Sequence, residues 1–343
     1  MSEANDRAGS AETWRGPGAA APSRPRRALA RHLLPWVVAV GLLAWVLRKQ
    51  SWSALVAAFH QAPLGPFLAA SVVLLIANCA ADTLAMYFTF GWFGCRLRYR
   101  ELFVVRAATY LLAVVQYYVG QAAIVAYLYR RGVNVLRASG FILFISGINL
   151  AVLVLFASAG LASDRVPQPW LRYIPGAVGA GAILYGAVLQ IRPAPLVRMR
   201  LLAPLFEMGV VGHLKSTLVR IPHVLVLIVW HYMALRMFGV AVTPLRALVY
   251  LPAVFFLAAL PISVQGLGMS QAAATLFFAT PGDPTSGARV IAYTFAMTGM
   301  SLLTQLTMGF AFLPAARRLG LSAAAPVEHV EPSAAGEVAG PSL

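Results

Sequence analysis

The sequence predicts an all-α, polytopic membrane helix bundle, and its composition and hydropathy support this fold class. Hydrophobic residues fill 60% of the 343 positions, charged residues fill 11%, and the mean hydropathy is +0.75. An ordinary soluble domain carries about 25% charged residues. The composition therefore excludes a soluble globular enzyme and a disordered chain. It leaves room for six to eight spans of roughly 20 apolar residues each.

Two polar tails flank the apolar region. The composition predicts three regions: a disordered basic cytoplasmic tail at 1–31, a transmembrane domain at 32–318 and a disordered C-terminal tail at 319–343. Apolar segments between the tails predict helices, because an open strand edge leaves backbone groups unpaired in lipid. The segments are 32–47, 64–94, 102–129, 139–163, 171–191, 218–238, 245–279 and 290–314. The mixed stretch 192–217 is expected to lie along the membrane interface.

The segments 102–129 and 245–279 contain polar or helix-breaking residues, and each is either one kinked span or a re-entrant hairpin. Eight straight spans place 16 Lys and Arg residues on the inner side and 11 on the outer side. Six spans with two hairpins place 20 inside and 7 outside. Positive residues favour the cytoplasmic side, so this count favours hairpins that enter from opposite faces, with both termini cytoplasmic.

A weak internal repeat indicates two pseudo-symmetric inverted halves. Residues 120–123 read Gly-Gln-Ala-Ala, and residues 270–273 read Ser-Gln-Ala-Ala. Each stretch lies in one of the two interrupted segments. Inverted repeats with discontinuous helices at corresponding positions are typical of membrane transporters.

Two motifs carry a resemblance to a known family. Residues 118–122 (Tyr-Val-Gly-Gln-Ala) lead to an Arg-rich turn at 130–133, and residues 260–271 read Leu-Pro-Ile-Ser-Val-Gln-Gly-Leu-Gly-Met-Ser-Gln. Over roughly 33–318 the chain resembles the transmembrane region of lysylphosphatidylglycerol synthase and its stand-alone relatives, the flippase-like integral membrane proteins. The resemblance implies lipid translocation across the bacterial inner membrane. The aminoacyl-transferase domain of the full synthase is absent, so lysine transfer is not implied.

Four positions depart from the family pattern. Gln121 and Gln271 stand where the family has glutamates, Ser270 where it has arginine, and Gln116 where it has proline. The hairpin glycines and Pro261 are retained. The resemblance therefore implies the scaffold more strongly than the site. The departures favour a different cargo or a non-transporting role.

Asp82 is the strongest single candidate for function, because an acid inside a span is costly and is usually functional or paired. Ser71, Asn78, Asp82 and Thr89 follow helical spacing and predict one face turned into the bundle. The alternative for this face is a hydrogen-bonded seam between helices. Arg106 either pairs with Asp82 or faces the surface, and the sequence does not decide between these positions.

Two further polar stripes have competing interpretations. Arg220, His223 and His231 share one helix face; Arg220 either binds a headgroup phosphate or extends to the cytoplasmic interface, and the histidines either titrate or pack. A second stripe is most simply explained as helix packing. Its members are Thr294, Thr298, Ser301 and Gln305, with Ser146 and Asn149 as a weaker counterpart.

The hairpin tips are the favoured binding region, because glycines allow close backbone approach and half-helix N-termini offer N–H groups to an anion. The alternative is that the helix breaks are purely architectural. The complete set of predicted substrate-binding residues is Asn78, Asp82, Gln116, Gly120, Gln121, Arg220, His223, Gln265, Gly266, Gly268, Ser270 and Gln271.

The sequence therefore predicts an inner-membrane lipid translocase for a lipid with an anionic or polar headgroup. Its expected partners are membrane lipids and proteins of lipid or glycan biosynthesis, not nucleic acid. No enzyme, metal or cofactor motif is found, so an ion gradient or the lipid gradient is the expected energy source. The main alternative is a non-transporting accessory subunit of a lipid or glycan biosynthetic complex. A membrane-embedded transferase relying on Asp82 and Asp164 is less well supported.

Overall fold

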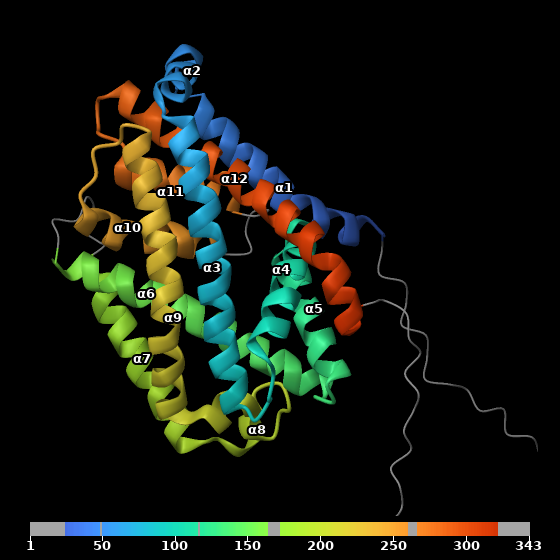
Figure 1. The fold of residues 1–343 in the computed structure, drawn as a ribbon. Coiled ribbons are helices and arrows are strands. Elements are labelled where there is room, and N and C mark those ends of the chain that lie inside the picture. Colours follow the sequence, from blue (N-terminus) through green and yellow to red (C-terminus); the bar gives the residue numbers. More distant parts are fainter. Residues whose placement is uncertain (1–24, 49, 116, 164–171, 260–265, 322–343) are drawn as a thin grey trace, which may run out of the picture.

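The computed structural model describes residues 25–48, 50–115, 117–163, 172–259 and 266–321, and every regular element in these ranges is a helix (Figure 1). Along the chain the helices are α1 (Pro25–Leu47), α2 (Trp52–Gln61), α3 (Leu64–Trp92), α4 (Tyr99–Val115), α5 (Tyr117–Arg130), α6 (Val135–Ser163), α7 (Ile174–Ile191), α8 (Ala194–Val197), α9 (Ala203–Met237), α10 (Pro244–Ala259), α11 (Met269–Phe278) and α12 (Pro284–Ala316). A π-helical turn follows at Arg317–Leu321.

Five of these helices are long and apolar enough to cross a membrane. They are α3, α7 and α9, together with Val135–Ala159 of α6 and Thr285–Leu319 around α12. Shorter apolar stretches lie in α1 (Trp36–Leu47) and in α10. The predicted all-helical, multi-pass membrane architecture is confirmed at this level.

Helix boundaries differ from the sequence expectation at several places, most at the starts of α1 and α9, and α2 falls in no predicted segment. Helix α1 begins at Pro25, inside the predicted tail 1–31, whose residues 1–24 lie outside the described part of the chain. Helix α9 begins at Ala203, ahead of the predicted span 218–238. Gly209 breaks its geometry with φ 54° and ψ −171°, a conformation that glycine adopts without a Cβ penalty. Residues from 210 onward therefore continue in the same helix as the predicted span 218–238.

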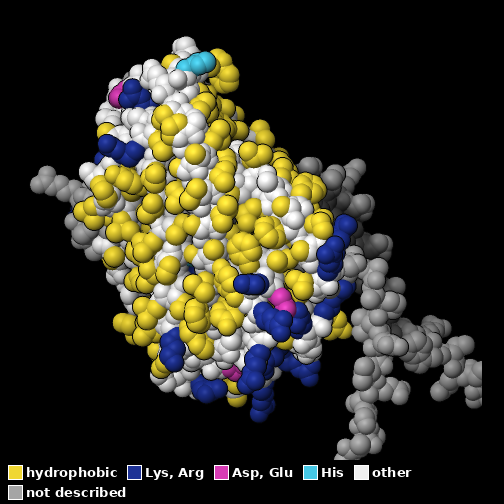
Figure 2. All heavy atoms as spheres, in the orientation of Figure 1, with side chains coloured by type: hydrophobic (Ala, Val, Ile, Leu, Met, Phe, Trp, Pro, Cys, Tyr) yellow, Lys and Arg dark blue, Asp and Glu magenta, His cyan; other side chains and the backbone are white. Residues whose placement is uncertain are grey.

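The outer surface is largely apolar, as expected for helices surrounded by lipid. Figure 2 shows hydrophobic side chains over most of the bundle, with Lys and Arg gathered at the end where Figure 1 draws α8. Only 6% of the apolar stretch of helix α7 is buried inside the bundle, and the side chain of Ile183 on this helix is 76% exposed. Because such a surface is unfavourable in water, this helix requires a lipid environment.

The basic end of the bundle carries ion pairs between neighbouring elements. Arg131 Nη2 lies 2.6 Å from Glu101 Oε2, which joins the end of α5 to α4. Arg137 of α6 makes a bidentate contact with Glu207 of α9, at 3.1 and 2.9 Å. These side chains are partly solvated, so each pair contributes little stability by itself.

Helix α12 begins with a well-formed cap. Asp283 Oδ1 accepts a hydrogen bond from the Thr285 N–H at 2.9 Å, and Pro284 occupies the first helical position. A second hydrogen bond from the Thr285 hydroxyl favours the carboxylate, and the pKa of Asp283 is lowered from its usual value. The cap fixes where this long helix starts.

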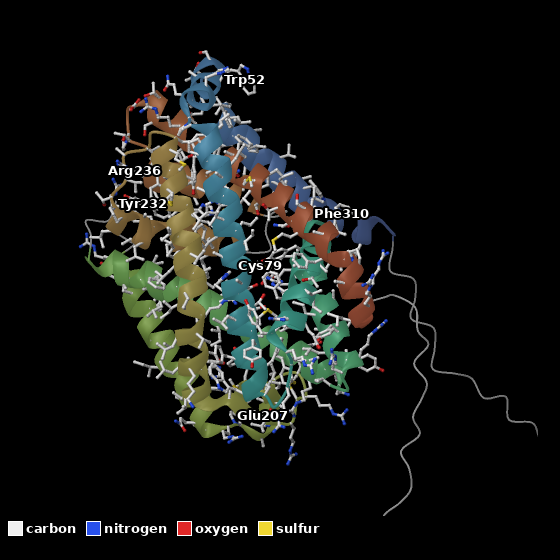
Figure 3. All side chains as sticks on the ribbon, viewed as in Figure 1. Trp52, Cys79, Glu207, Tyr232, Arg236 and Phe310 are labelled. Carbon is white, nitrogen blue, oxygen red and sulfur yellow. The ribbon has the colours of Figure 1, made fainter. Side chains whose placement is uncertain are left out.

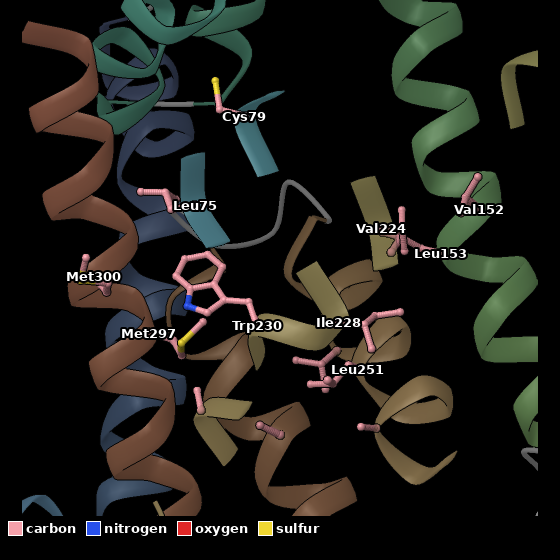
Figure 4. Packing of buried hydrophobic residues seen from close by; sticks show 14 of the residues in the cluster. Leu75, Cys79, Val152, Leu153, Val224, Ile228, Trp230, Leu251, Met297 and Met300 are labelled. Carbon is pink, nitrogen blue, oxygen red and sulfur yellow. The ribbon is translucent and has the colours of Figure 1, made fainter. Parts of the chain in front are cut away.

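The interior is packed by large apolar and aromatic side chains from several helices. The Trp230 indole of α9 lies between Leu75 of α3 and Met297 of α12 (Figure 4). Helices α4 and α12 approach closely, because a Cβ added at Gly309 would lie 2.7 Å from Leu111 Cβ and 2.9 Å from its backbone nitrogen. This glycine therefore sets the distance between two of the helices that surround the interior.

We expect Gly309→Leu to destabilise the protein by about 1–3 kcal/mol, the usual cost of overpacking. The new side chain would displace the α4 backbone at Leu111. Gly299→Leu is the matched control on the same helix, because a Cβ there meets nothing within 4 Å. Thermal unfolding of the purified protein in nanodiscs measures both variants. Equal transition temperatures for the two would contradict the close α4–α12 approach.

Candidate functional site

A buried carboxylate held between two arginines forms the centre of the candidate site. Asp82 of α3 is 1% exposed, Arg106 of α4 is 7% exposed and Arg220 of α9 is 5% exposed. Arg106 Nε donates to Asp82 Oδ2 at 2.5 Å, and Arg220 Nη1 donates to Asp82 Oδ1. Figure 3 places Cys79, three residues before Asp82, between Trp52 at one end of the bundle and Glu207 at the other. The cluster thus lies well inside the bundle.

This arrangement answers two questions that the sequence left open. Arg106 pairs with Asp82 and does not face the surface. Arg220 does not extend to the interface, because its guanidinium contacts Asp82 and also donates from Nε to Asn149 Oδ1 at 3.1 Å. The positive-inside count had assigned both arginines to the cytoplasmic side. Helical periodicity identifies the face of a residue, whereas its depth depends on the neighbouring helices.

The predicted polar face of α3 combines both of its proposed roles. Ser71 and Thr89 are 0% and 4% exposed; Ser71 Oγ accepts from Trp230 Nε1 at 3.0 Å, and the Thr89 hydroxyl donates to the carbonyl of Ala85. These two residues serve helix packing. Asn78 and Asp82, between them on the same face, line a cavity.

The cluster carries one uncompensated positive charge. Arginine remains protonated in proteins, and two guanidinium groups favour the ionised form of a carboxylate between them. Two cations and one anion leave a net charge of +1. The other acids in the described ranges, Glu101, Glu207 and Asp283, are at the surface or partly exposed. A buried charge without a partner is costly, so the cluster favours an added anion.

A cavity of about 340 Å³ opens beside this cluster, within the size range of ligand-binding pockets. Helices α3, α4, α5, α6, α9, α10, α11 and α12 all contribute to its wall. The polar lining residues are Asn78, Asp82, Arg106, Tyr110, Tyr117, Asn149, Arg220, His223, His231, Ser270, Tyr293, Thr294, Thr298, Ser301 and Gln305. The remaining wall is apolar, including Leu75, Leu227, Val254 and Met297.

The stripe on α12 lines the cavity, although its spacing first suggested helix packing. Thr294, Thr298, Ser301 and Gln305 all reach the wall. The Thr298 hydroxyl donates to the Thr294 carbonyl at 2.9 Å, and Gln305 Nε2 donates to Ser301 Oγ at 3.1 Å. The sequence showed that these residues share a face. It gave no signal that the face borders a cavity.

The two histidines of α9 occupy different surroundings. His223 Nδ1 lies 3.3 Å from the carbonyl oxygen of Asn78, near the arginine cluster. His231 Nδ1 lies 2.5 Å from the Tyr293 hydroxyl, and its ring packs edge-on against Phe255 at a centroid distance of 4.6 Å. His231 is therefore held by aromatic packing, as one of the two sequence interpretations expected.

The hairpin residues are only partly brought to the cavity. Ser270 lines it, whereas Gly120, Gln121, Gly266, Gly268 and Gln271 are absent from its lining. Gly120 instead allows α5 to pack against Thr109 and Ala113 of α4. Gln271 Oε1 accepts from the Gly268 N–H at 2.6 Å and caps α11. Gln116 and Gln265 lie outside the described residues.

The glycines of the second interrupted segment permit close packing. A Cβ at Gly266 would lie 2.8 Å from Ala258 Cβ, and one at Gly268 would lie 2.7 Å from the carbonyl oxygen of Ala39. The start of α11 thus lies against the end of α10 and against α1. These contacts support the architectural interpretation for both glycines.

Sequence reasoning did not identify several residues of the cavity wall. Arg106 was considered either as a partner of Asp82 or as a surface residue, and Tyr110 and Tyr117 were not considered. Asn149 was noted as a weak stripe, but its contact with Arg220 spans 71 positions and has no sequence signal. In the described part of the chain, no group of three His, Cys, Asp or Glu residues is placed to hold a metal ion.

Comparison of the chain with models of protein families, with curated proteins and with solved structures gives no match.

We expect Asp82→Asn to lower the free energy of unfolding by about 3–5 kcal/mol, because it leaves two buried guanidinium groups without a counter-charge. Adding Arg106→Gln returns the net charge of the cluster to +1, so the double variant should recover part of the loss. Asp283→Asn is the control, because asparagine also caps helices and the site is at the surface. Unfolding in nanodiscs compares the variants. If the losses in unfolding free energy caused by Asp82→Asn and by Arg106→Gln simply add in the double variant, the charge coupling is contradicted.

Proposed function

We propose that this protein translocates a lipid with an anionic or polar headgroup across the bacterial inner membrane. The observation that carries the proposal is the buried Asp82–Arg106–Arg220 cluster, with its net positive charge, beside a cavity walled by apolar helices. Ionisable residues inside membrane-spanning segments commonly mark substrate or ion pathways. Arginine in particular matches the geometry of phosphate and carboxylate oxygens.

The charge of the cluster lowers the main barrier to headgroup movement. An anion that leaves water for an apolar interior loses its hydration, and this loss is costly unless opposite charge and hydrogen bonds replace it. Arg106 and Arg220 supply that charge at depth, and the cavity supplies polar groups around it. The acyl chains remain in the bilayer beside the bundle. Only the headgroup then has to pass through the protein.

The paired short helices support re-entrant hairpins on both sides of the cavity. Helices α4 and α5 have 17 and 14 residues, and α10 and α11 have 16 and 10. Figure 1 shows α4 and α5 side by side. Wall residues come from α4, α10 and α11. Six spans with hairpins from opposite faces would give the inverted halves typical of transporters.

Cysteine labelling tests this topology. In a background without Cys79 and Cys95, single cysteines replace the exposed residues Arg98, Leu136 and Ser53. We expect positions 98 and 136 to react from the cytoplasmic side and position 53 from the opposite side. The α4–α5 pair would then enter and leave by one face. If positions 98 and 136 react from opposite sides of the membrane, the α4–α5 pair crosses the membrane and the hairpin is overturned.

Reconstitution into proteoliposomes tests translocation directly. We expect labelled anionic lipids to exchange leaflets faster with the protein, and Arg220→Gln to slow this exchange at least tenfold. Arg220→Gln leaves the neutral Asp82–Arg106 pair, so the fold is retained while the net charge is lost. Arg220→Lys should restore part of the rate, because it keeps the charge without the planar fork. Arg236→Gln, an exposed position on the same helix, is the control.

Rates equal to those of protein-free vesicles across a broad lipid panel would overturn the transport proposal. The accessory-subunit alternative would then be favoured. It is also the alternative favoured by glutamine at positions 121 and 271.

A further inference from the structure

We infer that the cavity selects a phosphate that carries a neutral, hydroxyl-bearing substituent of the glycerol-phosphate type, and that it discriminates against headgroups with a cationic amine. This inference rests on the proposed lipid handling at the same site and narrows its substrate class. Three features of the wall carry it: arginine N–H groups without a hydrogen-bond partner among the described residues, unpaired side-chain acceptors in the same wall, and the shortage of negative charge.

The arginines retain donors for phosphate oxygens. Arg220 uses Nη1 for Asp82 and Nε for Asn149, and within the described residues its Nη2 has no hydrogen-bond partner. Arg106 uses Nε for Asp82 and holds its guanidinium 5.0 Å from the ring centre of Tyr110. Its two terminal nitrogens have no hydrogen-bond partner in the described ranges. A guanidinium offers five N–H donors, so several are left to face an anion.

The rest of the polar wall is neutral and suits hydroxyl groups. Asn78 Oδ1 and Gln305 Oε1 are buried atoms with no hydrogen-bond partner in the part of the chain that the structure describes. Both residues line the cavity, together with the hydroxyls of Thr298 and Ser301. A hydroxyl both donates and accepts, so it satisfies a side-chain amide in either orientation. Buried acceptors left unpaired are costly, which makes a donor in the ligand favourable.

The neutral stripe of α12 and the arginine cluster line the same cavity. Gln305 of α12 shares its wall with Arg106 of α4 and Arg220 of α9. Helix α12 packs against α4, since Gly309 lies against Leu111. One ligand in this cavity can therefore contact both the neutral stripe and the cation cluster.

A cationic amine finds no counter-charge in this cavity. Asp82 is the only acid among the described residues of the lining, and each of its oxygens already contacts an arginine. An ammonium group would add to the existing net charge of +1. Three aromatic rings of the wall are already engaged: Phe255 and Tyr293 pack edge-on with His231, at centroid distances of 4.6 and 5.8 Å, and the ring centre of Tyr110 lies 5.0 Å from the Arg106 guanidinium.

The test compares headgroups at constant chain length. Short-chain phosphatidylglycerol, phosphatidic acid, phosphatidylethanolamine and phosphatidylcholine are titrated against the full chain in detergent, with binding read from the shift in melting temperature. Soluble glycerol 3-phosphate and inorganic phosphate form separate arms. We expect phosphatidylglycerol to bind at least tenfold more tightly than the ethanolamine and choline lipids. It should also bind several-fold more tightly than phosphatidic acid.

Two threonines on α12 provide a matched pair of variants. Thr298 lines the cavity and Thr307 is exposed, and both hydroxyls donate to the carbonyl four residues earlier, at 2.9 and 2.8 Å. Thr298→Val, combined with Gln305→Leu, should reduce the preference for phosphatidylglycerol over phosphatidic acid to about one. Thr307→Val should leave this preference unchanged. Both variants should retain binding of phosphatidic acid through Arg106 and Arg220.

The possible outcomes separate this inference from the proposed function. Amine lipids that bind as tightly as phosphatidylglycerol would overturn the inferred selectivity. If the preference for phosphatidylglycerol over phosphatidic acid is unchanged by Thr298→Val with Gln305→Leu, the inferred contacts between these residues and the ligand hydroxyls are overturned. In both cases the translocation proposal stands if anionic lipids still exchange leaflets. Glycerol 3-phosphate that binds as tightly as phosphatidylglycerol would identify a soluble phosphate as the ligand. Absence of both lipid binding and exchange would overturn the proposed function itself.

Discussion

The organisation of this bundle depends on one carboxylate that neutralises only half of the positive charge around it. Asp82 of α3 contacts Arg106 from α4 and Arg220 from α9, so two consecutive helices and a third that is distant in sequence meet at one buried point. Removing charges from water is costly, and only good geometry and additional hydrogen bonds offset that cost. The contact of Arg220 with Asn149 brings α6 into the same network. The polar cluster therefore determines how four helices face each other within an otherwise apolar interior.

Packing around the cluster keeps the cavity from collapsing onto it. Trp230 lies between Leu75 and Met297 and donates its indole N–H to Ser71, so a large side chain is fixed in position and orientation. Aromatic side chains with a satisfied polar atom are well suited to this role. At Gly309 the absence of a side chain has the opposite effect, because it lets α4 and α12 approach each other closely. The large Trp230 side chain and the close contact at Gly309 lie at different places around the cavity, which occupies the space between α3, α4, α9 and α12.

The sequence was sufficient for the fold class and for one half of the site. Composition and hydropathy predicted a helical membrane protein, and the spacing of Ser71, Asn78, Asp82 and Thr89 predicted an inward face, as found. Pairing of Asp82 with Arg106 was one of two alternatives that the sequence left open, and its pairing with Arg220 was not predicted, because Arg220 lies 138 positions away. Periodicity gives the direction of a side chain around its own helix. The meeting of two such directions is a property of tertiary packing.

The same limit explains why the favoured hairpin glycines lie outside the lining of the cavity. Gly120, Gly266 and Gly268 were selected because glycine permits close approach, and close approach is what the structure shows. Their close neighbours are helix atoms: Thr109 and Ala113, Ala258, and Ala39 and Leu42, respectively. A glycine in a sequence cannot indicate whether a ligand or a helix fills the space beside it. The stripe on α12 presents the converse case, since small polar residues that look like packing face an open cavity.

The net charge of +1 links the stability of the site to its selectivity. Loss of an arginine leaves a neutral pair, whereas loss of Asp82 leaves two cations, so the three residues are not equivalent although they form one cluster. The same count applies to a ligand: an anion brings the cavity to neutrality, and a zwitterion or a cation does not. A neutral cluster would hold a headgroup only through hydrogen bonds, which water supplies equally well. The unpaired charge is therefore the feature that gives an anionic headgroup an advantage over water in this cavity.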